Sequence, residues 1–112
     1  MLSKELVAAS AEPLILSLLS KGESYGYAII QEVRKLSEDQ IQWTDGMLYP
    51  VLHRMEENGW IASRWEEAEN GRKRKYYSIK KDGQKALKEK REQWTAVNSV
   101  LSGLWREQYV QP

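Results

Sequence analysis

The sequence predicts a mainly α-helical fold with one small β-hairpin, and three observations support this fold class. Apolar residues recur at helical spacing in four segments of the chain. Two short segments rich in β-forming residues flank an Asn-Gly pair, which favours a tight turn between strands. The chain has 112 residues and no cysteine. This length suits one compact domain that holds together without disulfide bonds.

The first predicted helix covers residues 5–20. A dense apolar cluster from Leu14 to Leu19 marks it as buried, and Gly22 is the type of residue that ends helices. Pro13 either kinks this helix or lies in the first turn of a shorter one, because proline has no amide hydrogen to donate. The pattern leaves both starts open.

The second predicted helix begins with Ser24 as its N-cap and runs to about Ser37, before a polar connection. Four side chains fall on one face of it at spacings of four, four and three residues. They are Tyr25, Ile29, Val33 and Leu36. We expect this face to be buried.

The third predicted helix follows Thr44 or Asp45 as its N-cap and ends at Gly59. Its inward stripe has the spacing i, i+3, i+4 and i+7 and consists of Leu48, Val51, Leu52 and Met55. Its outward face carries Met47, Tyr49, Pro50, His53, Arg54 and Glu57. Pro50 is tolerated near the first turn, where amides have no helical partner. We expect this outward face to stay free of the core.

Residues 60–65 and 73–79 are the two predicted strands. The Asn-Gly pair lies in the connection between them, and the second strand begins with three basic residues. We expect a hairpin that projects as a basic wing, with Trp60 and Trp65 packing it against the helical body.

The last predicted helix runs from residue 84 to about residue 108, and its apolar side chains follow the a and d positions of a heptad repeat. The three-helix body is too small to cover this stripe, so we expect two copies of the chain to pair through it as a homodimer. The predicted dimerisation residues are Leu87, Trp94, Val97, Leu101, Leu104 and Trp105.

Three helices, a hairpin and a long last helix describe a winged helix-turn-helix domain in residues 1–80 and a C-terminal dimerisation helix in residues 81–112. The net charge is only +1, but residues 72–91 carry ten basic and two acidic side chains. Such a block is either the footprint of a polyanion or a solvated helix face. Its place in the wing, next to the third helix, favours double-stranded DNA as the partner.

We expect the third helix to enter the major groove, with the wing on the flanking phosphates. The predicted DNA-binding residues are Thr44, Tyr49, His53, Arg54, Arg72, Lys73, Arg74 and Lys75. Some have alternative roles: Tyr49 packed over the wing, His53 inert at the surface, and Arg54 paired with Glu56 or Glu57.

The basic strand of the wing leaves one question open. Lys73 and Lys75 lie on one face of the strand, and Arg72 and Arg74 lie on the other. Only one of these two sets can face DNA squarely, and the alternation alone does not choose between them.

Composition excludes several other functions. A chain without cysteine has no thiol catalysis and no thiolate metal site, and its single histidine leaves little for another metal centre. No glycine-rich phosphate loop is present either, so we expect no enzymatic activity and no cofactor. No apolar run approaches the length of a membrane span and no signal peptide is evident, so we expect a soluble, cytoplasmic protein.

Several segments, taken in this order, resemble the PadR family of bacterial transcriptional regulators. They are LILSLL at residues 14–19, YGY at 25–27, GMLYP at 46–50, RMEENG at 54–59 and RKYY at 74–77. The resemblance covers roughly residues 5–90. It implies a winged-helix domain whose last helix forms a homodimer, in a repressor that small molecules release. The short C-terminal part resembles the subgroup with a single dimerising helix.

Residues 92–97 resemble the same region of multidrug-binding repressors of this family. That resemblance implies that Trp94 and its dimer mate stack on a flat aromatic effector, with Val97 beside them. An indole pair at a dimer seam suits such a ligand, because it offers two π faces and makes few polar demands. The alternative is that Trp94 only fills the dimer core.

The sequence therefore predicts a dimeric repressor that binds a pseudopalindromic operator and is released by a small, aromatic effector. The alternative is a winged helix that binds other proteins and has no affinity for DNA. The net charge near zero mildly favours that alternative.

Overall fold

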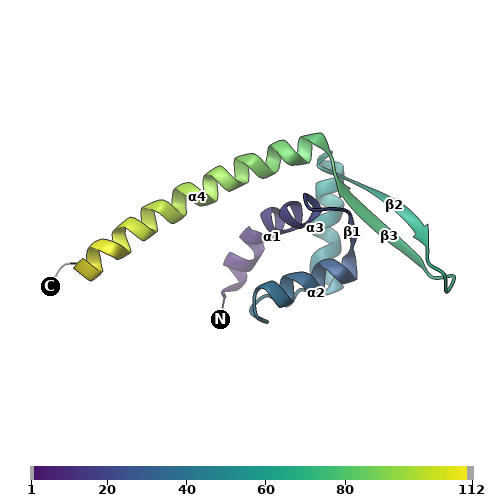
Figure 1. The fold of residues 1–112 in the computed structure, drawn as a ribbon, viewed down its shortest axis with the longest axis horizontal. Helices are drawn as coiled ribbons and strands as arrows, with labels where there is room; N and C mark the ends of the chain where they lie inside the picture. The colour runs from purple at the N-terminus through teal and green to yellow at the C-terminus, as the bar shows by residue number, and fades with distance from the viewer. Residues whose placement is uncertain (1, 111–112) are drawn as a thin grey trace.

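The computed structural model describes residues 2–110 and confirms the predicted fold class. Within these residues, four helices and three short strands follow in the order α1 (Lys4–Leu19), β1 (Ser24–Tyr25), α2 (Gly26–Leu36), α3 (Asp45–Glu57), β2 (Ile61–Glu67), β3 (Lys73–Ile79) and α4 (Lys81–Val110). Figure 1 shows the three shorter helices gathered near the start of α4, with the wing projecting on one side and the rest of α4 on the other. The molecule is therefore elongated, with a longest dimension of 65 Å.

Helix α1 is continuous through Pro13, so the alternative of a shorter helix that begins at this proline is wrong. The N-cap of the helix is Ser3, whose hydroxyl accepts a hydrogen bond from the N–H of Leu6 at 3.1 Å. Ile15 and Leu16 are completely buried. α1 thus forms a central part of the core.

The start of α2 differs from the prediction. Ser24 is not an N-cap: it forms β1 together with Tyr25, and the helix begins at the next residue. β1 pairs antiparallel with β3, with Ser24 opposite Tyr77 and Tyr25 opposite Tyr76, so the sheet has the order β1-β3-β2. A strand of two residues has no recognisable pattern of its own. It exists because β3 offers backbone partners to its N–H and C=O groups.

Leu36 also departs from the predicted apolar face of α2. Ile29 and Val33 are buried, but Leu36 is 67% exposed. It is the last residue of the helix, and the chain turns toward α3 immediately afterwards. Helical spacing places Leu36 on the same face of α2 as Ile29 and Val33, but it does not show that the core ends before this residue.

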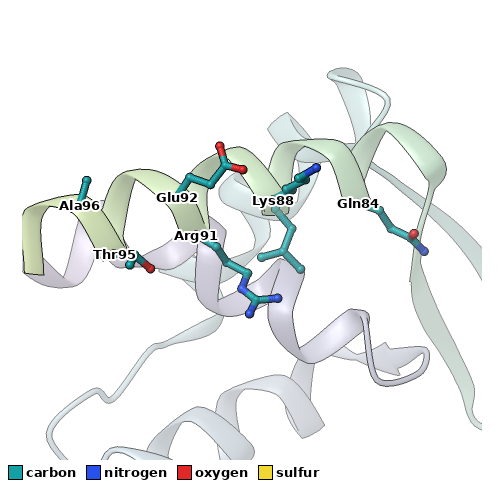
Figure 2. Close-up of a pocket in the computed structure, with 7 residues that line it drawn as sticks. Gln84, Lys88, Arg91, Glu92, Thr95 and Ala96 are labelled. Atoms are coloured by element: carbon teal, nitrogen blue, oxygen red, sulfur yellow. The ribbon is translucent and has the colours of Figure 1, made fainter. Parts of the chain in front are cut away.

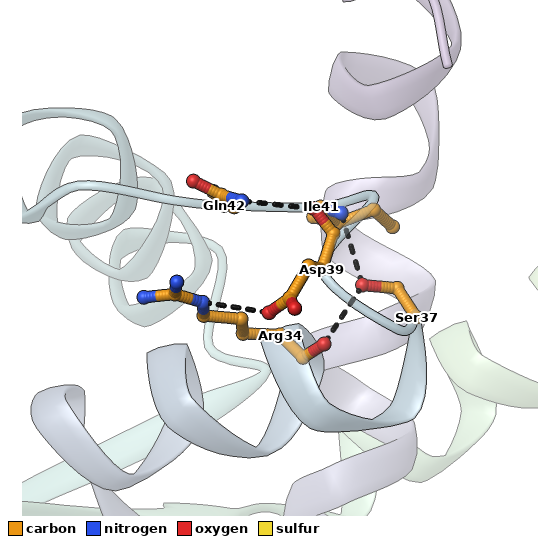
Figure 3. A network of polar contacts seen from close by, with 5 residues as sticks. All are labelled: Arg34, Ser37, Asp39, Ile41 and Gln42. Atoms are coloured by element: carbon orange, nitrogen blue, oxygen red, sulfur yellow. Dashed lines mark hydrogen bonds and ion pairs between the residues drawn. The ribbon is translucent and has the colours of Figure 1, made fainter. Parts of the chain in front are cut away.

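The turn between α2 and α3 is held by side-chain hydrogen bonds, which Figure 3 shows. Glu38 and Asp39 have positive φ angles of 51° and 68°, which reverse the chain direction. Arg34 Nε donates to Asp39 Oδ1 at 2.8 Å, and the N–H of Ile41 donates to Ser37 Oγ at 2.9 Å. These bonds hold the turn that leads from α2 toward α3.

The core lies between the three shorter helices, the base of the sheet and the first turns of α4. Most of the predicted stripe of α3 contributes to it, because Leu48, Leu52 and Met55 are buried and Val51 is half-buried. The predicted end of α3 is confirmed by Gly59, which follows the helix with a φ of 77°.

Strands β2 and β3 form the predicted hairpin and pair along their whole length. Gly71 has a φ of 80° in the connecting turn, as the Asn-Gly signal requires. Trp60 packs on the core as predicted. Trp65 is 66% exposed, so its predicted packing against the body is wrong. Figure 1 gives the reason: the hairpin leaves the helical body and extends well beyond it.

Helix α4 starts close against the base of the hairpin. The N–H of Lys80 donates to the carbonyl oxygen of Trp60 at 2.8 Å. A Cβ atom at Gly83 would lie 2.1 Å from the same carbonyl oxygen, so this approach requires glycine. α4 is longer than predicted at both ends, and residues 111–112 of the predicted dimerisation segment lie outside the described residues.

The two halves of α4 have different surroundings. Leu87, the first of the predicted dimerisation residues, packs in the core of its own chain and is 8% exposed. Every residue from Arg91 to Val100 is exposed. No helix in the described residues, α4 included, is both long enough and apolar enough to span a membrane.

Candidate nucleic-acid interface

Helix α3 presents a polar face away from the core. The predicted cap at its start is confirmed: Thr44 Oγ1 accepts a hydrogen bond from the N–H of Met47 at 3.3 Å. Amides in the first turn of a helix lack helical partners, so this end favours an anionic oxygen such as that of a phosphate. The exposed side chains that follow are Met47, Tyr49, Pro50, His53, Arg54 and Glu57.

Tyr49 leans from α3 onto the beginning of α2. Its phenol lies against Gly26, where an added Cβ atom would come within 2.5 Å of the hydroxyl oxygen. The glycine therefore makes room for the phenol, which lies against the start of α2. Tyr49 as a whole remains 44% exposed.

His53 and Arg54 have different neighbours although they are adjacent in the chain. His53 Nε2 lies 2.7 Å from Glu57 Oε1, one turn further along the exposed face. Arg54 lies on the flank near α1, where its Nε is 3.7 Å from Glu12 Oε2. The structure thus pairs Arg54 with Glu12 instead of with the neighbouring glutamates of α3. His53 occupies the outward face, and Arg54 its edge.

The register of the hairpin shows which basic residues of β3 lie on the side of the wing that faces α3. Tyr77 lies opposite Ser63, and Lys73 and Lys75 share its face of β3 because side chains alternate along a strand. On this face, Ser63 Oγ donates to Glu56 Oε2 of α3 at 2.6 Å. The two lysines therefore lie on the side of the wing that faces α3. We call the exposed face of α3 and this side of the wing the α3–wing surface.

Two arginines on the other side of the wing, Arg64 and Arg74, interact with side chains of the same chain. The guanidinium of Arg74 lies 4.6 Å from the ring centre of Tyr25. Arg64 forms ion pairs with Glu23 and, at 3.0 Å, with Glu66. The hydrogen bond from Arg64 holds the pKa of Glu23 below its usual value. These arginines stabilise the outer face of the sheet and do not belong to the α3–wing surface.

The structure brings some of the predicted DNA-binding residues together and separates others. Those on α3, at its N-cap or on the α3 side of the wing are Thr44, Tyr49, His53, Arg54, Lys73 and Lys75, with Arg54 at the edge near α1. Arg72 is exposed in the turn at the tip. Trp65 was not predicted to belong to this surface, but it lies directly opposite Lys75. The sequence shows that Trp65 shares a strand face with Ser63, two residues before it. It does not show that the wing extends far enough to leave Trp65 exposed.

The predicted effector and dimerisation side chains form an exposed stripe along α4. Trp94 is 40% exposed, and the residues that continue the stripe are Val97, Leu101, Leu104 and Trp105. Val100, which does not follow the heptad positions, is an additional exposed apolar side chain beside them. A single chain therefore leaves a row of large apolar side chains in water.

A shallow groove of about 560 Å³ also lies along α4. Figure 2 shows its polar walls, with Arg91 and Thr95 on one side of the helix and Glu92 and Ala96 on the other. Trp94 and Val97 do not line this groove. The described residues contain no group of three His, Cys, Asp or Glu side chains that could hold a metal ion.

Comparison with known sequences gives a family match. The sequence model of the transcriptional regulator PadR-like family matches residues 15–89. This segment includes α3, the whole hairpin and the part of α4 that packs on the body. The transcriptional regulator YqjI of Escherichia coli is 32% identical over 80 residues, which cover 71% of this chain and 37% of that protein.

Solved structures show the same architecture. A transcriptional regulator from Clostridium thermocellum has a TM-score of 0.83 and 31% sequence identity, and the match covers 99% of this chain and 100% of that one. A PadR family transcription regulator from Clostridium difficile has a TM-score of 0.75 and 30% identity, with 86% and 98% of the two chains covered. The similarity therefore includes the long last helix as well as the winged body.

Proposed function

This chain belongs to the PadR-like family of transcriptional regulators, and on this premise we propose that it acts as a homodimeric repressor. It is a DNA-binding regulator rather than an enzyme. In our proposal, the dimer binds a pseudopalindromic operator through two copies of the α3–wing surface and leaves it when a small aromatic effector binds. The observation that carries the proposal is the position of Lys73 and Lys75 on the α3 side of the wing.

Binding to DNA would use the two parts of the α3–wing surface differently. α3 enters the major groove, where His53 approaches base edges and the Tyr49 hydroxyl donates to a phosphate. The ammonium groups of Lys73 and Lys75 contact phosphates beside that groove. In a symmetric dimer the two α3 helices occupy half-sites separated by about 34 Å, one turn of DNA, or by a multiple of that distance.

The exposed stripe of α4 supports the homodimer. Complete burial of a valine, leucine or similar side chain stabilises an association by about 1.5–3 kcal/mol, and a twofold interface counts each residue twice. Val97, Leu101 and Leu104 are exposed in the single chain, so their burial between two copies would stabilise a dimer.

The effector would bind where the two copies of Trp94 meet. A planar aromatic cation is expected to quench tryptophan fluorescence by stacking on the indole pair, and Trp94→Ala is expected to abolish this quenching. Trp105→Ala serves as the control, because it removes an indole of similar exposure from the same stripe. Equal affinity of the Trp94→Ala variant and the unmodified protein would refute the stacking role.

The repressor proposal is tested by fluorescence anisotropy with DNA from upstream of the protein's own gene and with a scrambled duplex. We expect tighter binding to the upstream DNA and a fall in affinity as salt rises, with a slope of about 0.9 for each phosphate contact. Substituting Lys73 and Lys75 with glutamine lowers that slope. If neither duplex binds in a salt-dependent way, the repressor proposal is refuted. A winged helix that binds other proteins is then the favoured function.

A further inference from the structure

Trp65 is a large apolar side chain in a place where the rest of the fold cannot bury it. It lies in β2, two residues beyond Ser63, which is the last residue of that strand to contact α3 through a hydrogen bond. Trp60, at the base of the hairpin, packs on the core, whereas Trp65 is 66% exposed. An indole left in water forgoes more apolar burial than almost any other side chain. Its position therefore suggests that a second molecule covers it.

The surroundings of Trp65 indicate what kind of molecule that is. Lys75 is its cross-strand partner, with Nζ 5.8 Å from the centre of the indole ring. Lys73 follows on the same face, opposite Glu67. This face of the wing thus presents the indole ring of Trp65 beside the ammonium groups of Lys73 and Lys75 and one carboxylate. Such a combination fits a partner that has both negative charge and apolar surface.

We propose that Trp65 is a DNA-contact residue whose indole packs against deoxyribose, while Lys73 and Lys75 contact the adjacent phosphates. This inference rests on the proposed function, because it assumes that the α3–wing surface meets DNA. The sugar of the DNA backbone presents C–H groups next to charged phosphates, which matches Trp65 with Lys75 directly opposite it and Lys73 diagonal to it. The contact is sequence-independent and helps to set how far the wing follows the duplex.

The contact of Trp65 and the contacts of the lysines differ in their dependence on salt. Packing of an indole on sugar releases no counterion, whereas loss of one lysine–phosphate contact lowers the salt slope by about 0.9. Trp65→Ala is therefore expected to weaken binding about five- to tenfold at every salt concentration and to leave the slope unchanged. Lys75→Gln is expected to weaken binding and to lower the slope.

The experiment measures anisotropy of upstream operator DNA at several salt concentrations for the full chain and its variants. Leu36→Ala is the matched control, since Leu36 is 67% exposed but lies at the far end of α2. We expect this control to bind like the unmodified protein, and Trp65→Phe to retain most of the affinity. A change in tryptophan emission on addition of DNA should also shrink in Trp65→Phe.

Three outcomes overturn the inference. Equal affinity of Trp65→Ala and the unmodified protein refutes the contact while leaving the repressor intact. An altered oligomeric state of Trp65→Ala by light scattering, with unchanged DNA affinity, assigns Trp65 to a protein contact instead. Absence of salt-dependent DNA binding by the unmodified protein refutes the proposed function and this inference together.

Discussion

At the scale of single residues, one glycine determines how Tyr49 is held. Gly26 begins α2, and the tyrosine phenol of α3 fills the space that a Cβ atom would occupy. The sequence shows this glycine only as part of a Tyr-Gly-Tyr segment, so its role as the seat of a tyrosine from another helix depends on the tertiary structure. This contact fixes the position of the tyrosine side chain between α3 and the start of α2.

We predict that Gly26→Ala lowers the free energy of unfolding by about 1–3 kcal/mol, because the new methyl group displaces the phenol. In a Tyr49→Ala background the same substitution should cost almost nothing, since the clash is gone. Urea denaturation of the four proteins of this double-mutant cycle measures the coupling. Equal costs of Gly26→Ala in both backgrounds would show that the two residues do not touch.

A second prediction concerns the buried Tyr77 at the base of the wing. Burial raises the pKa of its phenol above the ordinary value, and Tyr49 and Glu56 add to the shift. The folded state therefore keeps this proton to a higher pH than the unfolded state, whose tyrosines titrate near pH 10. The stabilising contribution is complete below about pH 10 and is lost as the pH rises above that value.

The matching experiment compares unfolding free energies of the unmodified protein and Tyr77→Phe between neutral pH and about pH 11. We expect the unmodified protein to lose stability more steeply above about pH 10. Parallel curves for the two proteins would mean that the phenol is not buried in the folded state.

At the scale of elements, local signals predicted α3 and the hairpin well. Thr44 and Gly59 mark the ends of α3, and the Asn-Gly pair marks the turn of the wing. β1 escaped prediction because a two-residue strand exists only through its pairing with β3. The face of the wing that turns toward α3 was likewise undetermined, because alternation distinguishes two faces but only the contact of Ser63 with α3 orients them.

The errors at Trp65 and Leu36, and the unexpected burial of Leu87, have a common physical cause. Periodicity shows which side of an element an apolar residue occupies, but not how far the core extends along that element. The core stops before Trp65 on the hairpin and before Leu36 on α2, whereas it includes Leu87 on α4. These limits depend on the sizes and positions of several elements together.

The stripe of α4 gives a prediction about assembly. Val97→Glu places a charge in the proposed dimer seam, where desolvation of a carboxylate is costly, so the variant should be monomeric or much weaker in dimerisation. Ser99→Glu is the control, because Ser99 is exposed on the opposite side of the helix and lies outside the stripe. Light scattering at micromolar concentration distinguishes the two. A dimeric Val97→Glu variant would place the interface elsewhere.

At the scale of the whole molecule, the chain has a basic region and an exposed apolar region that lie apart from each other. The wing and the start of α4 carry the basic block, and the exposed end of α4 carries the apolar stripe. Figure 1 shows these regions extending from the body in different directions. Pairing through the far half of α4 would therefore leave both α3–wing surfaces accessible to one duplex.

Hydroxyl-radical footprinting of the protein on DNA from upstream of its gene tests the proposed symmetric arrangement most directly. We predict two protected segments related by twofold symmetry, with centres separated by about one turn of DNA or a whole number of turns. Weaker protection by a Lys73→Gln, Lys75→Gln variant should appear first at the phosphates that flank these segments. A single protected segment at saturating protein, or uniform protection along the duplex, would contradict the symmetric two-surface arrangement.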